Sequence, residues 1–214
     1  MFVFGLIIFD MDGVLVNTSP CHGRAYDDLW RKLGIEGPPY DEIAGRRTGE
    51  VVVERTRNLK PAAAQVSEWV LFKQKRAREY LCTEDISYAD TAPCLVALES
   101  RGVPAALGTS ASRANTELIL DRLGLARFFR VVVTGEDVRE GKPSPEIYLS
   151  VMERAGMSAN ETLVVEDSAS GLEAAIAAGA RAASVRTGER IDSPKFIGAF
   201  PDLRRLMNEL GIET

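Results

Sequence analysis

The fold is decided by the stretch Phe9-Asp10-Met11-Asp12-Gly13-Val14-Leu15. It follows an apolar run, Met1 to Ile8, which is interrupted only by Gly5 and predicts a strand buried on both faces, as in a parallel sheet. Because adjacent carboxylates are costly to bury, Asp10 and Asp12 are expected just past the carboxyl end of this strand. Open α/β sheets bind their ligands at that edge.

Asp10 and Asp12 are two residues apart, so in an extended segment their side chains share a face, about 6 to 7 Å from each other. Two carboxylates in this arrangement can hold a hard cation, and they can also divide nucleophilic and acid/base work. A solvated turn is the plain alternative. The choice between these interpretations depends on what the rest of the chain places at the same edge.

The composition is that of a globular protein with an ordinary core. The 214 residues allow one large domain or one domain with a smaller insertion, and 45% of them are hydrophobic. Acids outnumber bases by 31 to 26, whereas nucleic-acid-binding proteins usually carry a basic face. The apolar start is too short for a signal peptide or a membrane span. Cys21, Cys82 and Cys94 lack metal-site spacing, so we expect a cytoplasmic protein with reduced thiols and no nucleic-acid or membrane partner.

The remainder of the chain predicts a helical block and then alternating helices and strands. The block contains predicted helices over 21–33, 51–59 and 62–81 and no predicted strand. From Asp85 onward, short apolar runs alternate with helical patterns, which predicts an α/β fold with a doubly wound parallel sheet. The predicted strands are 103–107, 130–133, 162–165, 182–185 and, at the edge, 196–200, and the predicted helices are 93–101, 113–123, 145–155, 171–178 and 202–210.

This pattern predicts two domains. Residues 1–16 and 84–214 are expected to form the sheet domain, and residues 17–83 an inserted helical domain. The insertion follows the first strand, so it enters at the carboxyl edge of the sheet. A segment in that position can act as a lid over a site.

Two more predicted strands are followed by residues that suit phosphate. Thr109 and Ser110 follow the strand 103–107, where a hydroxyl and backbone amides can hold phosphate oxygens or simply cap the next helix. Lys142 precedes Pro143, which restricts the backbone and predicts a rigid turn facing the site. A lone lysine is more often simply solvated.

The strand 162–165 is followed by another pair of acids, Glu166 and Asp167. Two acids side by side after an apolar strand suggest a bound cation. Alternation along the strand lets only one of them face inward, so the two need not be equal ligands. Together the strand ends offer carboxylates, a hydroxyl and a lysine, a set that suits phosphoryl transfer.

The chain resembles the haloacid dehalogenase superfamily of aspartate-nucleophile phosphatases. The resemblance covers essentially the whole chain and implies a Rossmann-like core with a small inserted helical cap, Mg2+ as cofactor and a small phosphorylated metabolite as partner. Within the superfamily the chain is most similar to the β-phosphoglucomutase and phosphoglycolate phosphatase group. Four motifs in the family's order carry the resemblance: Asp10-Met11-Asp12-Gly13-Val14-Leu15, Thr109, Lys142-Pro143 and Glu166-Asp167-Ser168.

The resemblance also implies a role for each core residue. Asp10 would attack phosphorus and form an aspartyl-phosphate. Asp12 would protonate the leaving oxygen and then deprotonate water, and this second acid favours phosphate chemistry over dehalogenation. The remaining roles would be to hold phosphoryl oxygens (Thr109 and the Ser110 amide), to offset charge (Lys142) and to bind Mg2+ (Glu166 and Asp167, with Asp10 and Asp12).

Three cap residues become candidates for substrate binding through the same resemblance. His22 stands where the mutase has a cap-linker histidine, and local packing at a helix start is the alternative. The stretch Gly45-Arg46-Arg47-Thr48 resembles the cap's specificity loop, where Arg46 or Arg47 could grip an anionic substrate, or form a solvated basic loop. The mutase pattern has its arginine at another position and includes a serine that is missing here. This departure favours a phosphatase over a mutase.

Lys73 or Lys75 could supply a cap lysine that contacts substrate, although we expect a solvated helix face for each. The leading hypothesis is therefore a Mg2+-dependent phosphatase of a small metabolite, in particular a sugar phosphate. The runner-up is a sugar phosphomutase. A phosphonate hydrolase with a Schiff-base lysine in the cap and a non-catalytic phosphate-binding module are further alternatives. We expect a monomer or weak homodimer.

Overall fold

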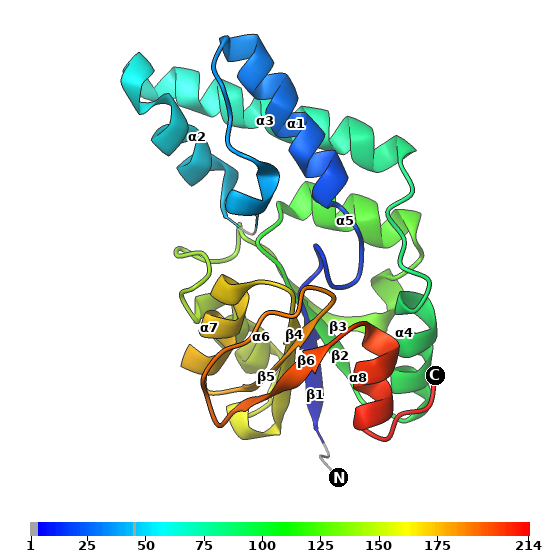
Figure 1. Ribbon diagram of the computed structural model, residues 1–214. Coiled ribbons are helices and arrows are strands. Elements are labelled where there is room, and N and C mark those ends of the chain that lie inside the picture. The colour runs from blue at the N-terminus through cyan, green and yellow to red at the C-terminus, as the bar shows by residue number, and fades with distance from the viewer. Residues whose placement is uncertain (1–3, 45) are drawn as a thin grey trace. The chain divides into compact units, whose positions relative to one another are not determined.

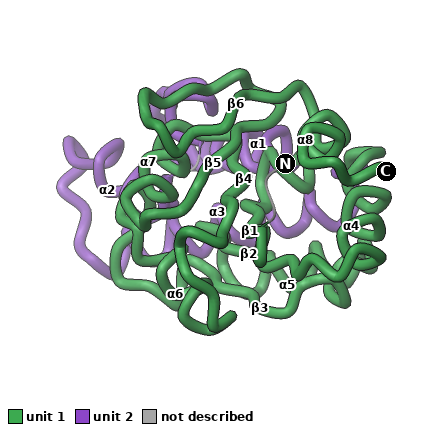
Figure 2. Tube along the Cα trace, turned by 90° about the horizontal axis from the view of Figure 1, so that it is seen from below, with its two compact units in different colours: residues 1–17, 87–214 green, residues 18–86 purple. Residues whose placement is uncertain are grey.

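The computed structural model describes residues 4–44 and 46–214 (Figure 1). The chain divides into two compact units, residues 1–17 with 87–214 and residues 18–86, which Figure 2 shows in different colours. The larger unit is an α/β domain and the smaller one is helical. The predicted fold class is confirmed.

The larger unit is built on a six-stranded parallel sheet with the order β3-β2-β1-β4-β5-β6. The first strand lies between β2 and β4, in register with both, and Ile8 pairs with Ala106 on one side and Val164 on the other. Every residue of β1, β2 and β4 is buried, as expected where helices cover both faces of a parallel sheet. The strands are β1 (Leu6–Phe9), β2 (Ala105–Gly108), β3 (Phe129–Val133), β4 (Thr162–Glu166), β5 (Arg181–Val185) and β6 (Phe196–Phe200).

Helices cover the two faces of this sheet (Figure 1). The helices α6 (Glu146–Ala155) and α7 (Ala169–Ala177) pack together over β2, β3, β4 and β5. The helices α4 (Thr91–Ser100) and α8 (Leu203–Glu209) pack together on the other face, and α5 (Arg113–Arg122) leads from β2 towards β3. Alanines of α7 and β5 contribute to the core, where small side chains let helix and sheet approach closely.

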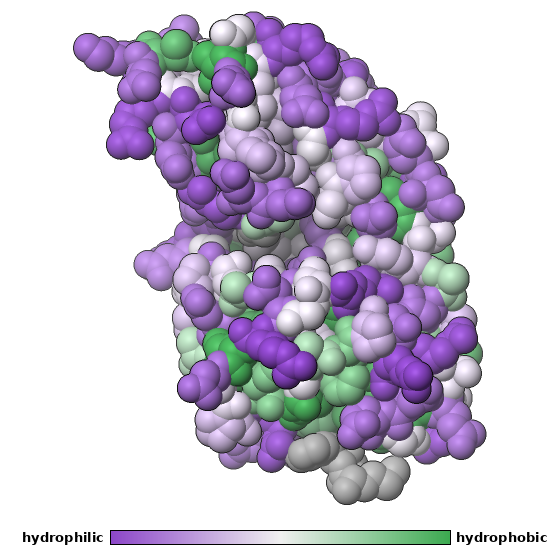
Figure 3. Space-filling model, in the orientation of Figure 1, coloured by the Kyte–Doolittle hydropathy of each residue, from purple (hydrophilic) through white to green (hydrophobic). Residues whose placement is uncertain are grey.

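The strand β6 forms one edge of the sheet and is the least buried strand. All its residues are partly exposed, and Figure 3 shows apolar colour gathered over this part of the larger unit. The pairing of β5 with β6 shifts register between Ala182 and Ala183, and Gly198 has a φ of 146°. Such irregularities twist an edge strand away from further pairing.

The smaller unit consists of α1 (Ser19–Leu33), α2 (Thr48–Thr56) and α3 (Ala63–Thr83). The helix α1 ends at Gly34, which takes the left-handed conformation with a φ of 64°. The three helices share an apolar core that includes Tyr26, Leu29, Trp30, Val51 and Val52.

The predicted elements are present, with changes at their ends. The first strand is Leu6–Phe9, and the part of its prediction on residues 1–3 lies outside the described residues. The predicted helix 51–59 begins at Thr48, and its last turn is the 3-10 helix Arg57–Leu59, which ends at a left-handed Lys60. Three further 3-10 turns were not predicted: Tyr40–Glu42, Ala126–Phe128 and Ala159–Glu161. In the described part of the chain, no helix has both the length and the apolar content that crossing a membrane requires.

Candidate active site

The carboxyl ends of β1, β2 and β4 meet at one edge of the sheet and carry the predicted core residues. Asp10 directly follows β1, Thr109 follows β2, and Glu166 ends β4. All three residues are buried, with at most 6% of the residue exposed. The strand order reverses between β1 and β4, and doubly wound sheets bind ligands at such a switch point.

Lys142 reaches this edge from the loop between β3 and α6. Its Nζ donates to Asp10 Oδ1 at 2.5 Å, to Glu166 Oε1 at 2.6 Å and to the Gly108 carbonyl at 3.3 Å. The side chain is only 3% exposed, so Lys142 faces this edge as expected, and the alternative of a solvated lysine does not hold. Burial lowers the pKa of Lys142, but Asp10 and Glu166 outweigh that effect and the pKa lies well above its ordinary value. The group is therefore a buried ammonium ion between two acids.

Glu166 is hydrogen-bonded through both carboxylate oxygens. Oε1 accepts from Lys142 and from the Tyr148 hydroxyl, the latter at 2.5 Å. Oε2 accepts from the backbone amides of Asp167 and Ser168 and from the Ser168 hydroxyl. Its carboxylate also lies against Gly171, where a Cβ would come within 1.9 Å of Oε1. These contacts fix Glu166 in one orientation.

Burial raises the pKa of all three acids, but the net shift differs between them. It raises the pKa of Asp10 to about 7 despite the opposing Lys142, and the carboxylates of Glu166 and Asp12 add to the rise. It also raises the pKa of Asp167 to about 8, again with help from neighbouring carboxylates, chiefly Glu166. At Glu166 burial acts in the same direction, but Lys142 outweighs it and the pKa is lowered. A further positive charge nearby would therefore favour the ionised forms of Asp10 and Asp167.

Asp10, Glu166 and Asp167 could bind a metal ion together. One carboxylate oxygen from each lies within 4.8 Å of the others, and oxygen ligands in such a cluster suit a hard divalent cation. The repulsion that raises the pKa of two of these acids is what a bound cation would relieve. The residues therefore fit the predicted metal site, with Glu166 the most constrained of the three.

The turn after β1 brings Asp12 and Gly13 to the same place. The charge of Asp12 is close enough to raise the pKa of both Asp10 and Asp167. Gly13 has a φ of 81°, and a Cβ there would lie 1.8 Å from Asp167 Oδ2. Only glycine allows the turn and the Asp167 carboxylate to approach so closely.

Thr109 and Ser110 form the turn between β2 and α5. The Thr109 amide donates to Val133, and its hydroxyl accepts from the Ala111 amide at 3.1 Å. Gly135 lies against this turn, because a Cβ there would be 2.6 Å from the Ser110 carbonyl. The turn is held on both sides, and Ser110 is partly exposed.

In the helical unit, His22 is paired with Lys73. Lys73 Nζ donates to His22 Nδ1 at 2.9 Å and lies 4.3 Å from the centre of the Tyr26 ring. Lys73 is only 4% exposed, so the expectation of a solvated helix face is wrong for it, because the ammonium group folds back onto α1. Burial lowers the pKa of His22 well below its ordinary value, and the ammonium of Lys73 lowers it further. His22 is therefore a neutral imidazole.

The predicted specificity loop is described only in part, because Gly45 lies outside the described residues. Arg46 donates to Glu54 at 2.6 Å, within the same unit. Arg47 precedes α2 and is partly exposed. Arg46 is thus engaged by a neighbouring acid of α2.

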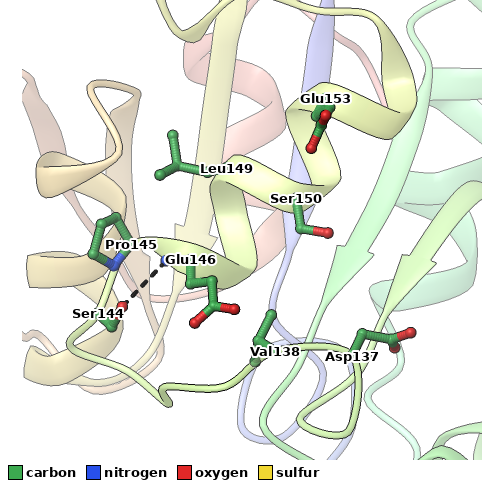
Figure 4. Close-up of a pocket in the computed structure, with 8 residues that line it drawn as sticks. All are labelled: Asp137, Val138, Ser144, Pro145, Glu146, Leu149, Ser150 and Glu153. Carbon is green, nitrogen blue, oxygen red and sulfur yellow. Dashed lines mark hydrogen bonds between the residues drawn. The ribbon is translucent and has the colours of Figure 1, made fainter.

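A separate hollow of about 470 Å³ lies beside the start of α6 (Figure 4). Asp137 lines it, but its carboxylate accepts from Thr134 and Arg113, and Glu146 accepts from the amides of Arg139 and Glu140. These acids hold the loop that carries Lys142. None of the predicted site residues lines the hollow.

Sequence reasoning missed Tyr148, which is fully buried and bonded to Glu166. It lies on α6 beside Ile147 and Val151, at the spacing of a core face, so its hydroxyl gave no separate signal. Its position shortly after the Lys142-Pro143 motif is the one feature that could have indicated a role in the site.

Comparison with known proteins gives one consistent result. A model of the haloacid dehalogenase-like hydrolase family matches residues 4–179. The phosphorylated carbohydrates phosphatase of Thermotoga maritima is 35% identical over 180 residues, 81% of each chain. The fructose-1-phosphate phosphatase of Escherichia coli is 30% identical over 189 residues, 84% of this chain and 95% of that one. The solved structure of CbbY from Rhodobacter sphaeroides in complex with phosphate has a TM-score of 0.78 at 25% identity, covering 92% and 93% of the two chains.

Proposed function

This chain belongs to the haloacid dehalogenase-like hydrolase family, and we propose that it is a Mg2+-dependent phosphatase of a small phosphorylated sugar. Its relatives include phosphoglycolate phosphatases, and its structural neighbours include β-phosphoglucomutase. The observation that carries the proposal is the contact of Lys142 with both Asp10 and Glu166 at the carboxyl ends of β1 and β4. Two relatives named for phosphorylated carbohydrates and fructose 1-phosphate support a sugar phosphate as substrate.

In this proposal Asp10 is the nucleophile. Its carboxylate attacks phosphorus, the bond to the leaving sugar oxygen breaks, and an aspartyl-phosphate forms. Lys142, held at 2.5 Å, stabilises the ionised carboxylate and offsets charge on the phosphoryl group. The Thr109 hydroxyl and the Ser110 amide bind phosphoryl oxygens.

Asp12 is the proposed general acid and base. It gives its proton to the leaving sugar oxygen, and the resulting carboxylate then takes a proton from the water that hydrolyses the aspartyl-phosphate. Because the turn at Gly13 places Asp12 near Asp10 and Asp167, one side chain can serve both steps.

Asp10, Asp12, Glu166 and Asp167 are the proposed metal-binding residues, Asp12 through its carbonyl. Bound Mg2+ would supply positive charge that keeps the acids ionised and stabilises the phosphoryl oxygens. Since both Glu166 oxygens already accept hydrogen bonds, Asp10 and Asp167 are the side chains better placed to be direct ligands.

We propose that residues 18–86 are the cap domain and select the substrate. His22, Arg46 and Arg47 remain the proposed substrate-binding residues. Arg46 or Arg47 would grip an anionic or hydroxylated substrate end, and Arg46 would have to exchange its contact with Glu54 to do so.

A phosphate-release screen tests the function. Sugar phosphates, phosphoglycolate and nucleotides are supplied with Mg2+ or with a chelator, and release is expected from a sugar phosphate only when Mg2+ is present. Asp10→Asn should lower kcat about 10^4-fold or more, because the nucleophile is lost. The matched control is Asp121→Asn, an exposed position on α5, which should keep full activity. Full turnover by Asp10→Asn would sink the proposal.

The mutase alternative is separated in the same screen. With β-glucose 1-phosphate and a bisphosphate primer, a phosphatase releases free phosphate. Glucose 6-phosphate formed without matching phosphate release would identify a mutase instead.

A further inference from the structure

Arg186 directly follows β5 and has a backbone conformation that side chains rarely adopt. Its φ is 70°, and the Thr187 amide donates to the Val185 carbonyl at 2.9 Å across it. A bond between residues two apart around a positive φ is the rare and strained form of the γ-turn. Among the described residues that are not glycine, only Lys60 shares a positive φ. Strain of this kind persists where surrounding contacts require it.

The guanidinium group of Arg186 supplies such contacts. Its Nε donates to the Val14 carbonyl at 3.1 Å, and a terminal nitrogen donates to Asp90 Oδ1 at 2.8 Å. Its central carbon lies 3.6 Å from the centre of the Tyr88 ring. The side chain is 14% exposed, so these contacts are largely shielded from water. Asp90 in turn accepts from the Leu203 amide through its other oxygen.

These contacts join the two segments of the larger unit between which the helical unit is inserted. Val14 belongs to the turn that begins with Asp12, and the chain leaves this unit after residue 17. It returns at residue 87, just before Tyr88 and Asp90. Val16 and Ser87 form a β-bridge between the outgoing and returning segments. Arg186 lies between the two segments and bonds to both.

The neighbouring residue extends the connection to the acids of β4. The Thr187 hydroxyl donates to the Asp167 carbonyl at 2.6 Å. Residues 186 and 187 therefore contact both loops that carry carboxylates, the Asp12 turn and the Asp167 loop. A change of backbone at Arg186 would move both loops at once.

We propose that Arg186 is a positioning residue for the phosphatase reaction, which fixes the Asp12 turn against the returning segment 87–90. The proposal rests on the proposed function for its catalytic consequence. A planar guanidinium presents its donors in a fixed fork while its face stacks on a ring, whereas a lysine ammonium has neither the fork nor the flat face. The side chain touches neither the reacting atoms nor the proposed metal ligands' carboxylates, so it acts through the placement of Asp12.

Two variants and one control test this role. Arg186→Gly removes the guanidinium but suits the positive φ, so it separates backbone strain from side-chain contacts. Arg186→Lys keeps a positive charge for Asp90 but loses the paired contacts. Lys60→Gly, at the other positive φ, replaces a left-handed residue in the helical unit by glycine and serves as the control.

Kinetics and hydrogen–deuterium exchange give the outcome. We expect both Arg186 variants to lower kcat at least about tenfold with KM changed less than twofold, since misplaced catalytic groups slow chemistry more than binding. Peptides covering 11–17 and 87–91 should exchange faster, while the strand 162–166 and the Lys60→Gly control should match the wild type.

A kcat within twofold of wild type, or unchanged exchange in both peptides, would overturn the proposal. If Arg186→Gly does not fold, Arg186→Lys decides on the same two measurements. Exchange is measured without substrate, so it decides the placement of the turn even for a wild type that releases no phosphate. A wild type that releases no phosphate would count against the proposed function and not against the placement of the turn.

Discussion

Gly13 shapes the site through its backbone conformation and its lack of a side chain. Its φ of 81° makes the turn after β1, and its missing side chain leaves room for the Asp167 carboxylate. Gly34 offers a matched case, since its φ is 64° and nothing lies within 4 Å of the position where a Cβ would be. The two glycines share the backbone requirement and differ only in what surrounds them.

Alanine at each position should separate these effects. Both Gly13→Ala and Gly34→Ala should lower the free energy of unfolding by about 1–2 kcal/mol, the cost of a left-handed alanine. Gly13→Ala should in addition lower kcat about a hundredfold, because the Asp167 carboxylate must move away. Denaturant unfolding and steady-state kinetics measure the two quantities. Equal activity of the two variants would show that the contact at Gly13 has no catalytic weight.

At the residue scale, the sequence could predict which side chains lie together at the edge of the sheet. It could predict less about the contacts that orient each of them. Asp10, Thr109 and Glu166 were predictable because parallel strands end at one edge, and Lys142 because prolines constrain its loop. The hydroxyl of Tyr148 was hidden in an apolar helix face. The burial of Lys73 was missed because its contact with His22 joins helices far apart in the chain.

Among the elements, α1 and α3 are joined by a polar cluster around Asp28. Its Oδ2 accepts from Arg76 Nε at 2.6 Å and from the Tyr80 hydroxyl at 2.7 Å, and its Oδ1 accepts from Arg31. Burial raises the pKa of Asp28, but the bonds from Tyr80 and Arg76 outweigh it and the pKa is lowered. The ionised form therefore stabilises the packing of the two helices.

Asp28→Asn should lower the free energy of unfolding near pH 7 by on the order of 2 kcal/mol, because charge-assisted bonds are lost. A lowered pKa in the folded state gives stability that is present above the ordinary pKa and is lost as the pH falls through the folded value. The difference between variant and wild type should therefore shrink as the pH falls below about 4.

Thermal unfolding at a series of pH values measures this difference. Asp27→Asn is the matched control, because Asp27 is the exposed neighbour on the same helix. A destabilisation by Asp28→Asn that is constant with pH would contradict the assigned role of the charge.

The ends of elements show where sequence information stops. Gly34 marked the end of α1 correctly, because it supplies the left-handed residue that closes the helix. The helix predicted over 51–59 begins earlier, at Thr48, and tightens into a 3-10 turn at Arg57–Leu59. Short 3-10 turns such as Ala126–Phe128 depend on the packing of the chain around them and carry no periodic pattern.

At the scale of the whole molecule, the buried and mutually repelling carboxylates of the site destabilise the metal-free protein. The raised pKa values, about 7 for Asp10 and about 8 for Asp167 against 3.8 for an ordinary aspartic acid, mean that the folded state holds these protons more tightly. A raised pKa gives stability that is present below the ordinary value and is lost as the pH rises through the folded one. Without metal, stability should therefore decrease between about pH 4 and pH 8.

Mg2+ should reverse this loss. At a hundred times its dissociation constant, a ligand bound only to the folded state adds about 2.7 kcal/mol. We expect Mg2+ to raise the unfolding temperature strongly at pH 8 and little at pH 5. Asp167→Asn should raise the unfolding temperature in EDTA at pH 8, because a buried charge is removed, and should abolish the response to Mg2+. An equal response in variant and wild type would contradict the assignment of Asp167 as a ligand.

The sequence predicted a parallel sheet, but not the order of all its strands. Alternating patterns give the number and direction of strands, whereas the neighbours of β1 follow from how the crossovers pack. The inserted helices also could be predicted as a block, since no strand pattern interrupts them.

The bridge between Val16 and Ser87 means that the inserted segment begins and ends at adjacent points. A loop whose two roots already touch can be lengthened, shortened or exchanged without pulling the sheet out of register. The residues proposed for catalysis and the residues proposed for substrate binding can then change at different rates. Evolution can thus exchange the helical unit while the sheet domain is inherited unchanged.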